Sequence, residues 1–309
     1  MEEKKELLRI EHLTVSFAQY EKRSAKQGEL PVIRDLNVTV REGEIVAVVG
    51  SSGSGKSLLA HAVMGLLPEN AMLDGDIIYK GRKLDQKDKE KLRGKELALV
   101  PQSVSYLDPL MRVGKQVRGS DSGKKNLQKN IFQRLRLNEN TEKLYPFQLS
   151  GGMARRVLVS TAVLSGAEVI IADEPTPGLD LEMALETLKI FRELADEGKA
   201  VILITHDIDL AFHIADRVAV FYAGTTLEIA DAKEFQEGEG MLRHPYSKAL
   251  WRALPQNGFE PVPGFQPYAK YLPEGCLYFP RCPHRTEECD QKIPMREVRG
   301  GQVRCIHAT

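Results

Sequence analysis

The chain has 309 residues, of which 42% are hydrophobic and 28% charged, an ordinary composition for one large globular domain or two smaller ones. Lysine plus arginine and aspartate plus glutamate both number 43, so no basic excess indicates nucleic acid as the main partner. The charged start lacks a secretory-type apolar segment, and no apolar run approaches the roughly 18 residues that span a bilayer. We therefore expect a soluble, cytoplasmic protein that reaches a membrane only through partners.

The apolar pattern predicts strands that alternate with helices. Short apolar runs between about residues 7 and 40 predict β-structure interrupted by a polar loop, and "IVAVVG" predicts a buried strand before the helix "KSLLAHAVMGLL". Further helices are expected within 121–143, from 151 to about 164, over 181–198 and at "DIDLAFHIADR". Between them, "EVIIAD", "AVILITH" and "VAVFYAG" predict strands, so the sheet should be largely parallel.

A glycine-rich loop joins the first buried strand to its helix. The stretch "GSSGSGKS" fits the phosphate-loop pattern G-x-x-x-x-G-K-[ST]. Its backbone N–H groups would wrap a β-phosphate, Lys56 would pair with β- and γ-oxygens, and the Ser57 hydroxyl would ligate Mg²⁺. The alternative, a glycine turn with a surface lysine, is disfavoured by the strand–loop–helix context. The predicted phosphate-binding residues are Gly50, Ser51, Gly53, Ser54, Gly55, Lys56 and Ser57.

Polar residues follow three further apolar runs. Asp173 ends the strand "VIIAD" and is predicted to join the Mg²⁺ shell, while Glu174 is predicted to orient or deprotonate the attacking water. His206 follows "VILIT" and could hydrogen-bond a γ-phosphate and that water. Gln102 follows "ALVP" and could reach Mg²⁺ or water through its amide, although this signal alone is weak.

The stretch "YPFQLSGGMARR" places Ser150, Gly151 and Gly152 at the start of a predicted helix. Unpaired N–H groups and the positive dipole end make a helix N-terminus favourable for anions. On this stretch alone, an ordinary N-cap serine in a flexible loop is an equal alternative to a phosphate site.

All four cysteines lie in the last segment, at Cys276, Cys282, Cys289 and Cys305. They follow a stretch rich in proline and glycine that predicts irregular structure. Clustering in a reducing compartment favours a metal or cluster site over disulfides. The spacing lacks the C-x2-C pair of zinc ribbons, so zinc, reduced structural cysteines and an iron–sulfur cluster all stay open at this point.

The motifs "GSSGSGKS", "VPQ", "LSGGM", "VIIADEPT", "PGLD" and "ITHD" occur in the order and spacing of an ABC-type ATPase, which the chain resembles over about its first 235 residues. The resemblance implies an α/β fold with a mixed, largely parallel sheet, an antiparallel β subdomain and a helical subdomain at about 101–165. It also implies that "LSGGM" is the signature motif, which contacts the γ-phosphate of a nucleotide on the opposite subunit. Asp180 of "PGLD" would belong to the loop that links the two sites, and Phe17, or else Tyr20, would stack on adenine. Met153 replaces the commoner glutamine of the motif, a change expected to tune closure.

The last segment, from "RHPYSKALWRALP" through "GCLYFPRCPHRTEECDQKIP", resembles the C-terminal extension of peptide and nickel importer ATPases. This implies a cassette over 1–235, an extension over 236–309 and a [4Fe–4S] cluster on the four cysteines, with zinc as the alternative. The implied partners are a second, related ABC ATPase, two transmembrane permease subunits and an extracytoplasmic solute-binding protein, at the cytoplasmic face of the membrane.

The predicted function is ATP hydrolysis coupled to uptake of oligopeptides or dipeptides, with nickel or a metal chelate as the alternative cargo. A soluble ABC ATPase acting on nucleic acid or ribosomes is disfavoured, because the chain has one cassette and no heptads between its phosphate loop and signature. A non-hydrolysing regulatory cassette is disfavoured because Glu174 and His206 are both present.

Overall fold

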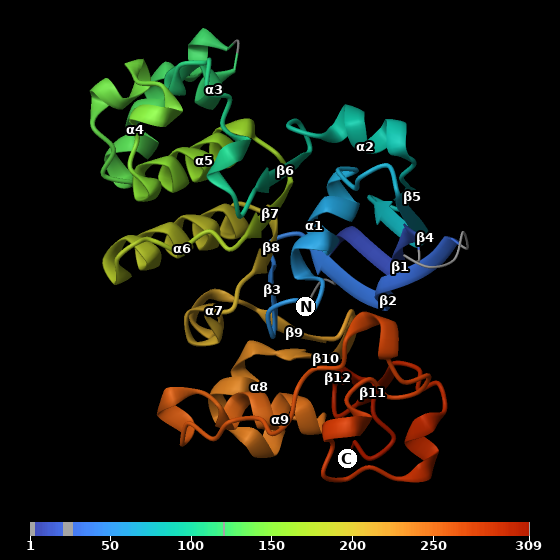
Figure 1. Cartoon of the computed structure of the whole chain (residues 1–309). Coiled ribbons are helices and arrows are strands. Elements are labelled where there is room, and N and C mark those ends of the chain that lie inside the picture. The colour runs from blue at the N-terminus through green and yellow to red at the C-terminus, as the bar shows by residue number, and fades with distance from the viewer. Residues whose placement is uncertain (1–3, 21–26, 120, 309) are drawn as a thin grey trace.

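The computed structural model describes residues 4–20, 27–119 and 121–308. An antiparallel sheet near the N-terminus has the strand order β2-β1-β4-β5 and packs against α1 (Figure 1). It confirms the β-structure predicted for residues 7–40, and adds strands that the sequence pattern did not reveal. The bounds are β1 (Glu6–Tyr20), β2 (Gln27–Arg41), β4 (Ala71–Tyr79) and β5 (Arg82–Lys83).

The main sheet has the order β11-β12-β10-β9-β3-β8-β7-β6. Its strands from β9 to β6 are parallel, as predicted, and β10, β12 and β11 continue it in antiparallel pairing. Every residue of β3, β7 and β8 is buried, which explains their unbroken apolar sequences. The strands of this parallel part are β3 (Ile45–Gly50), β6 (Leu97–Val100), β7 (Val169–Asp173), β8 (Ala200–Ile204) and β9 (Arg217–Tyr222).

The helices of the cassette are spread unevenly around the sheets (Figure 1). One group, α3, α4 and α5, lies together away from the antiparallel sheet, and its members share a core that contains Val113, Phe132 and Val157. This group is the helical subdomain that the resemblance implied. The helices are α1 (Lys56–Met64), α2 (Gln86–Leu92), α3 (Val113–Arg118), α4 (Lys125–Arg134), α5 (Gly151–Ser165), α6 (Leu181–Asp196) and α7 (Ile208–Ile214).

The C-terminal extension packs onto the cassette instead of forming a separate core. Tyr278, Leu254 and Ile293 belong to the same buried apolar cluster as the strands of the main sheet. The hairpin of β11 and β12 joins that sheet through β10, a feature that the irregular composition of the extension did not predict. Its regular elements are α9 (Pro245–Arg252), β11 (Arg296–Val298) and β12 (Gly301–Val303), while β10 (Thr225–Asp231) lies before it and α8 (Ala232–Glu237) spans its start.

None of the helices within the described ranges is both long and apolar enough to cross a bilayer.

Candidate nucleotide-binding site

The phosphate-binding loop runs from the end of β3 to the start of α1. Gly50 has φ 153°, and a Cβ there would lie 2.2 Å from the carbonyl oxygen of Phe221, so only glycine fits. Gly55 is the N-cap residue of α1 and has a left-handed backbone conformation at φ 94°. Because it has no side chain, it makes no capping hydrogen bond to the helix N–H groups. The first-turn N–H groups of α1 therefore remain available to an anion.

Lys56 lies buried beneath this loop. Its Nζ donates to the carbonyl oxygens of Gly50 at 2.9 Å and Ser51 at 3.0 Å. Burial lowers the pKa of Lys56, and the charges of Glu174 and Asp173 oppose that shift. Among the described residues, the buried Ser54 hydroxyl has no hydrogen-bond partner. A loop that holds a cation and an unpaired hydroxyl suits phosphate oxygens.

Asp173 ends β7 next to the start of α1 and is 2% exposed. Burial raises the pKa of its carboxyl; a hydrogen bond with the Ser57 hydroxyl and the charges of His61 and Lys56 act in the opposite direction. Its Oδ1 is buried without a partner among the described residues. Two of the three predicted Mg²⁺ ligands, Ser57 and Asp173, are thus in contact and offer the oxygen atoms that this ion prefers.

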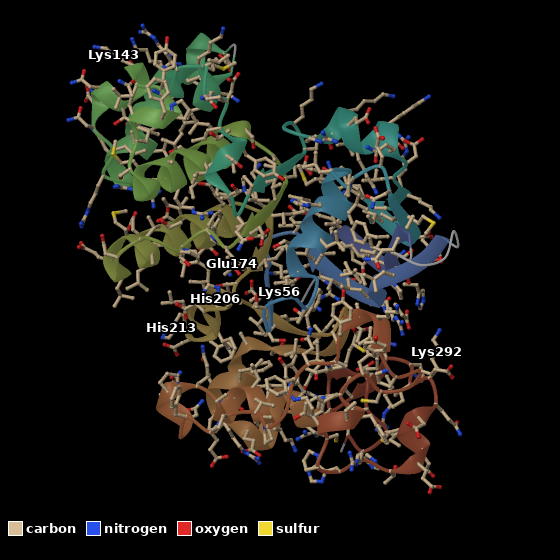
Figure 2. All side chains as sticks on the ribbon, in the orientation of Figure 1. Lys56, Lys143, Glu174, His206, His213 and Lys292 are labelled. Atoms are coloured by element: carbon tan, nitrogen blue, oxygen red, sulfur yellow. The ribbon has the colours of Figure 1, made fainter. Side chains whose placement is uncertain are left out.

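Glu174 lies within contact distance of both Gln102 and His206. Glu174 and His206 lie beside Lys56 of the phosphate-binding loop (Figure 2). Glu174 Oε2 accepts from Gln102 Nε2 at 3.4 Å and lies 3.2 Å from His206 Nδ1. The Glu174 N–H donates to the carbonyl oxygen of Ile204 at 2.8 Å. Because Glu174 has φ 48°, rare for a residue with a side chain, its backbone is held in a sparsely populated conformation at this point.

Arg155 is a residue of this region whose role the sequence did not reveal. It lies one turn into α5, and its Nη1 donates to the carbonyl oxygen of Pro101 at 3.0 Å. The side chain is 9% exposed, so this bond fixes the strand end before Gln102 to the helical subdomain. The arginine pair at residues 155 and 156 was visible in the sequence, but no pattern pointed to a main-chain acceptor 54 residues away.

Ser150 caps α5, and its Oγ accepts the Met153 N–H at 3.3 Å. Ser150 and Gly151 are exposed, and a Cβ on Gly151 would meet no atom within 4 Å. Asp180 caps α6 in the same way, accepting the Met183 N–H at 2.9 Å, and is also exposed. The signature helix therefore presents an open, capped N-terminus at the protein surface.

Phe17 lies in β1, opposite Leu30 and Ala71, and is partly buried against the core beneath the antiparallel sheet. The side chain of Tyr20, the other predicted adenine-stacking residue, lies outside the described residues.

The four cysteines are all free thiols, and Cys276, Cys289 and Cys305 are buried. Burial raises the pKa of Cys276 to about 11, and the charges of the other three thiols act in the same direction. Within the described part of the chain, no group of three or more His, Cys, Asp or Glu side chains is arranged to hold a metal ion.

Two parts of the chain match models of known protein families. Residues 33–177 match the ABC transporter family, and residues 227–289 match the C-terminal region of oligopeptide/dipeptide transporters. An oligopeptide transport ATP-binding protein, OppD of Escherichia coli (strain K12), is 35% identical, with 96% of this chain and 92% of OppD covered. The chain belongs to this family of ABC transporter ATP-binding proteins. The ABC ATPase cassette, its ATP-binding function and its ATP hydrolysis are thereby confirmed.

Other relatives agree with this family assignment. A dipeptide transport ATP-binding protein, DppD of Bacillus subtilis (strain 168), is 34% identical over 95% of this chain and 91% of its own length. The structure of the ATP-binding cassette MJ0796, a dimer in a post-hydrolysis state with ADP and Pi, aligns with a TM-score of 0.64 at 25% identity. That alignment covers 73% of this chain and 99% of MJ0796, so it confirms the predicted α/β cassette fold.

Proposed function

We propose that this ABC ATPase drives an importer of oligopeptides or dipeptides at the cytoplasmic face of a membrane. The observation that carries the proposal is the match of both parts of the chain to peptide transporters, together with Glu174 held between Gln102 and His206. The peptide names of the relatives favour this cargo over nickel or a metal chelate.

In the proposed site, the loop from Gly50 to Ser57 and Lys56 bind the phosphates of ATP, and Phe17 stacks on adenine. Ser57, Asp173 and Gln102 would hold Mg²⁺, which supplies charge neutralisation of the β- and γ-oxygens. Glu174 accepts a proton from the attacking water while His206 hydrogen-bonds that water and the γ-phosphate. A carboxylate that accepts from an amide and a histidine is well oriented for this role.

Ser150, Gly151, Gly152 and Asp180 complete a site on a second subunit in this proposal. The support is the exposed N-terminus of α5, where Ser150 caps the Met153 N–H and the positive end of the helix dipole points to the surface, toward a phosphate that another chain would bring. The proposed second subunit is a different but related ATPase, and two permease subunits and a solute-binding protein complete the importer. The proposed division is a cassette over 1–235 and an extension over 236–309.

Purification through a tag on this chain tests these partners. The expected complex contains this chain, a second ABC ATPase, and two membrane subunits in equal amounts, as mass spectrometry and native mass would show. Two copies of this chain without a second ATPase would contradict the heterodimer, and isolation of the chain with nucleic acid or ribosomes would contradict the importer.

A [4Fe–4S] cluster on the four cysteines is the proposed order-giving element of the extension. Cys276, Cys282 and Cys305 each hydrogen-bond to backbone N–H groups, from Tyr278, from His284, and from His307 and Ala308. Such N–H donors stabilise thiolates that ligate a metal, and a set of four cysteine ligands suits a cluster chemically. Ligation would supply folding free energy to a segment with little regular structure.

Anaerobic purification followed by metal analysis tests the cluster. The protein should be brown and carry roughly four irons per chain, and Cys289→Ser should lose both colour and iron. About one zinc per colourless chain would assign the cysteines to zinc instead. An ordered extension without either metal, detected as resistance to proteolysis, would contradict both.

A further inference from the structure

Two side chains of the extension contact Ser51, the second residue of the phosphate-binding loop. The Ser51 hydroxyl donates to Gln266 Oε1 at 2.5 Å. The phenol of Tyr246 is hydrogen-bonded to both the hydroxyl and the backbone of Ser51. The Ser51 carbonyl also accepts from Lys56 at 3.0 Å, so Ser51 contacts both the extension and the predicted phosphate-binding lysine.

Tyr246 is rigidly held. It lies in α9 and is 2% exposed. The centre of its ring lies 4.5 Å from the centre of the Tyr222 ring and 5.2 Å from that of the Tyr278 ring. Burial raises the pKa of its phenol, while the hydrogen bonds with Ser51 and the charge of Arg281 act in the opposite direction. A phenol can both donate and accept a hydrogen bond. The buried phenol therefore restricts the position of Ser51.

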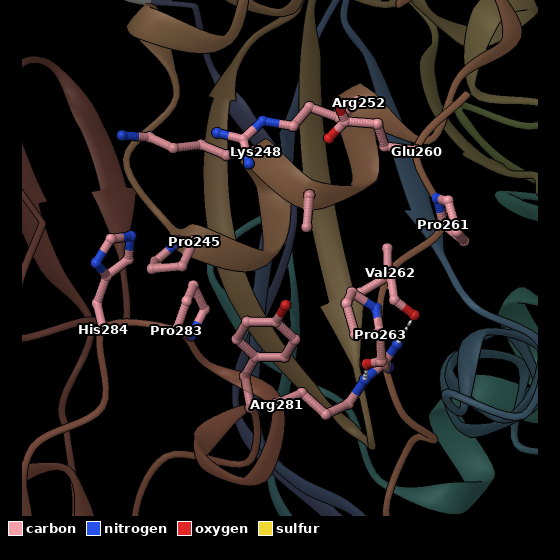
Figure 3. A pocket seen from close by; sticks show the side chains of 12 residues that line it. Pro245, Lys248, Arg252, Glu260, Pro261, Val262, Pro263, Arg281, Pro283 and His284 are labelled. Atoms are coloured by element: carbon pink, nitrogen blue, oxygen red, sulfur yellow. Dashed lines mark hydrogen bonds between the residues drawn. The ribbon is translucent and has the colours of Figure 1, made fainter. Parts of the chain in front are cut away.

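The segment that carries Gln266 is fastened by Arg281 (Figure 3). Arg281 Nε donates to the carbonyl oxygen of Pro263 at 2.7 Å and Nη2 to that of Val262 at 2.8 Å. The guanidinium also lies over the rings of Tyr222 and Tyr278, 5.8 and 5.9 Å from their centres. Gln266 thus approaches Ser51 from a segment that is itself anchored.

We propose that Tyr246 and Gln266 are positioning residues of the nucleotide site, through which the C-terminal extension holds the phosphate-binding loop ready for ATP. The loop contains Gly50, Gly53 and Gly55, all at positive φ, so without anchors it would lose conformational entropy when it closes on phosphate. Anchoring Ser51 in advance reduces that cost. This positioning of the loop by the extension goes beyond the assignment of the chain as an ATPase.

The test uses Tyr246→Phe and Gln266→Ala in the full-length chain and in the purified transporter. Each variant should weaken ATP binding by the chain about five-fold, the effect of losing one typical hydrogen bond. In the transporter, the KM for ATP should rise by a similar factor while kcat at saturating ATP stays unchanged, because neither side chain touches the reacting atoms. Gln302→Ala, at an exposed glutamine of β12, should leave both constants unchanged.

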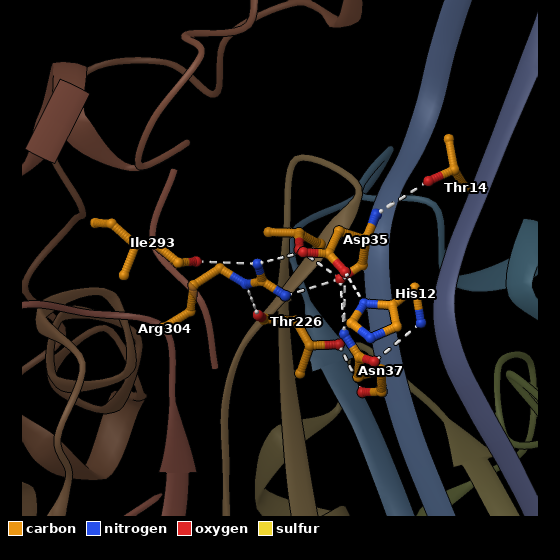
Figure 4. Close-up of polar contacts among 8 residues, drawn as sticks. His12, Thr14, Asp35, Asn37, Thr226, Ile293 and Arg304 are labelled. Carbon is orange, nitrogen blue, oxygen red and sulfur yellow. Dashed lines mark hydrogen bonds and ion pairs between the residues drawn. The ribbon is translucent and has the colours of Figure 1, made fainter. Parts of the chain in front are cut away.

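A second contact of the extension with the cassette provides the structural control (Figure 4). Arg304 Nη1 donates to Asp35 Oδ2 at 2.8 Å, and His12 Nδ1 lies 2.6 Å from Asp35 Oδ1. Burial would raise the pKa of Asp35, but the hydrogen bonds with His12 and Arg304 outweigh it and the net pKa is lowered. The stabilisation is therefore present at neutral pH and lost as the pH falls through the folded-state pKa. Asp35→Asn should lower the melting temperature without raising the KM for ATP.

Wild-type ATP affinity in both Tyr246→Phe and Gln266→Ala would overturn the proposal. Tighter ATP binding by the variants would also overturn the proposal, because ATP would then have to displace Gln266 from Ser51 in the wild-type chain. If Asp35→Asn raised the KM as much as the two test variants, general loosening of the extension would explain the effect, and the positioning role would be wrong.

Discussion

Replacing Glu174 with glutamine is expected to reduce ATP hydrolysis by the assembled transporter roughly a hundred-fold or more, the usual scale for loss of a general base. Glutamine keeps the size of the side chain and can still hydrogen-bond to Gln102 and His206, but it cannot accept a proton from water. The backbone at φ 48° is equally accessible to both residues, so the fold should not change. ATP affinity should be retained, because Lys56 and the loop N–H groups are intact.

The rate of phosphate release by the purified complex and a nucleotide titration of the chain measure these two effects. The matched control is Glu168→Gln. Glu168 immediately precedes the first residue of β7, and its carboxylate lies 2.7 Å from Lys80 Nζ and is 40% exposed. That change should leave hydrolysis close to wild type. Near wild-type hydrolysis by Glu174→Gln would remove Glu174 from the proposed chemistry.

Ser150→Arg is expected to abolish ATP turnover by the assembled transporter while the isolated chain still binds ATP. An arginine at the start of α5 places a bulky cation where the proposal puts the phosphate-facing N-terminus, and it blocks approach of the second subunit's nucleotide. Loss of the cap to Met153 should also destabilise the helix by about 1 kcal/mol, too little to unfold a domain of this size.

Ser165→Arg at the opposite end of α5 is the control, since a cation is favourable at a helix C-terminus. It should leave both turnover and binding unchanged. Loss of ATP binding by the isolated Ser150→Arg chain would mean that Ser150 acts within its own subunit, contrary to the proposed trans site.

The sequence predicted most of what lies at strand ends. Asp173, Glu174 and His206 follow buried parallel strands whose carboxyl ends share one edge of the sheet, so their proximity follows from the pattern. The phosphate-binding loop was predictable because the full pattern G-x-x-x-x-G-K-[ST] lies between a buried strand and a helix, the context that this motif requires.

Long-range contacts within irregular segments were not predictable. Gln266 meets Ser51 across 215 residues, and Arg304 meets Asp35 across 269, and neither pair has a periodicity that would reveal it. The sequence did not predict the β11–β12 hairpin because its strands span only 296–298 and 301–303. Strands of this length are too short to show an alternating apolar pattern. The trans role proposed for Ser150 rests on the resemblance, because a single chain does not display a site shared between two subunits.

The most direct measurement is ATP-driven uptake of a labelled oligopeptide by vesicles that contain the purified transporter with its solute-binding protein. We expect peptide accumulation that requires ATP on the side of this chain, stops with Glu174→Gln, and is not competed by nickel. Peptide uptake that persists with Glu174→Gln, or nickel uptake without peptide uptake, would contradict it.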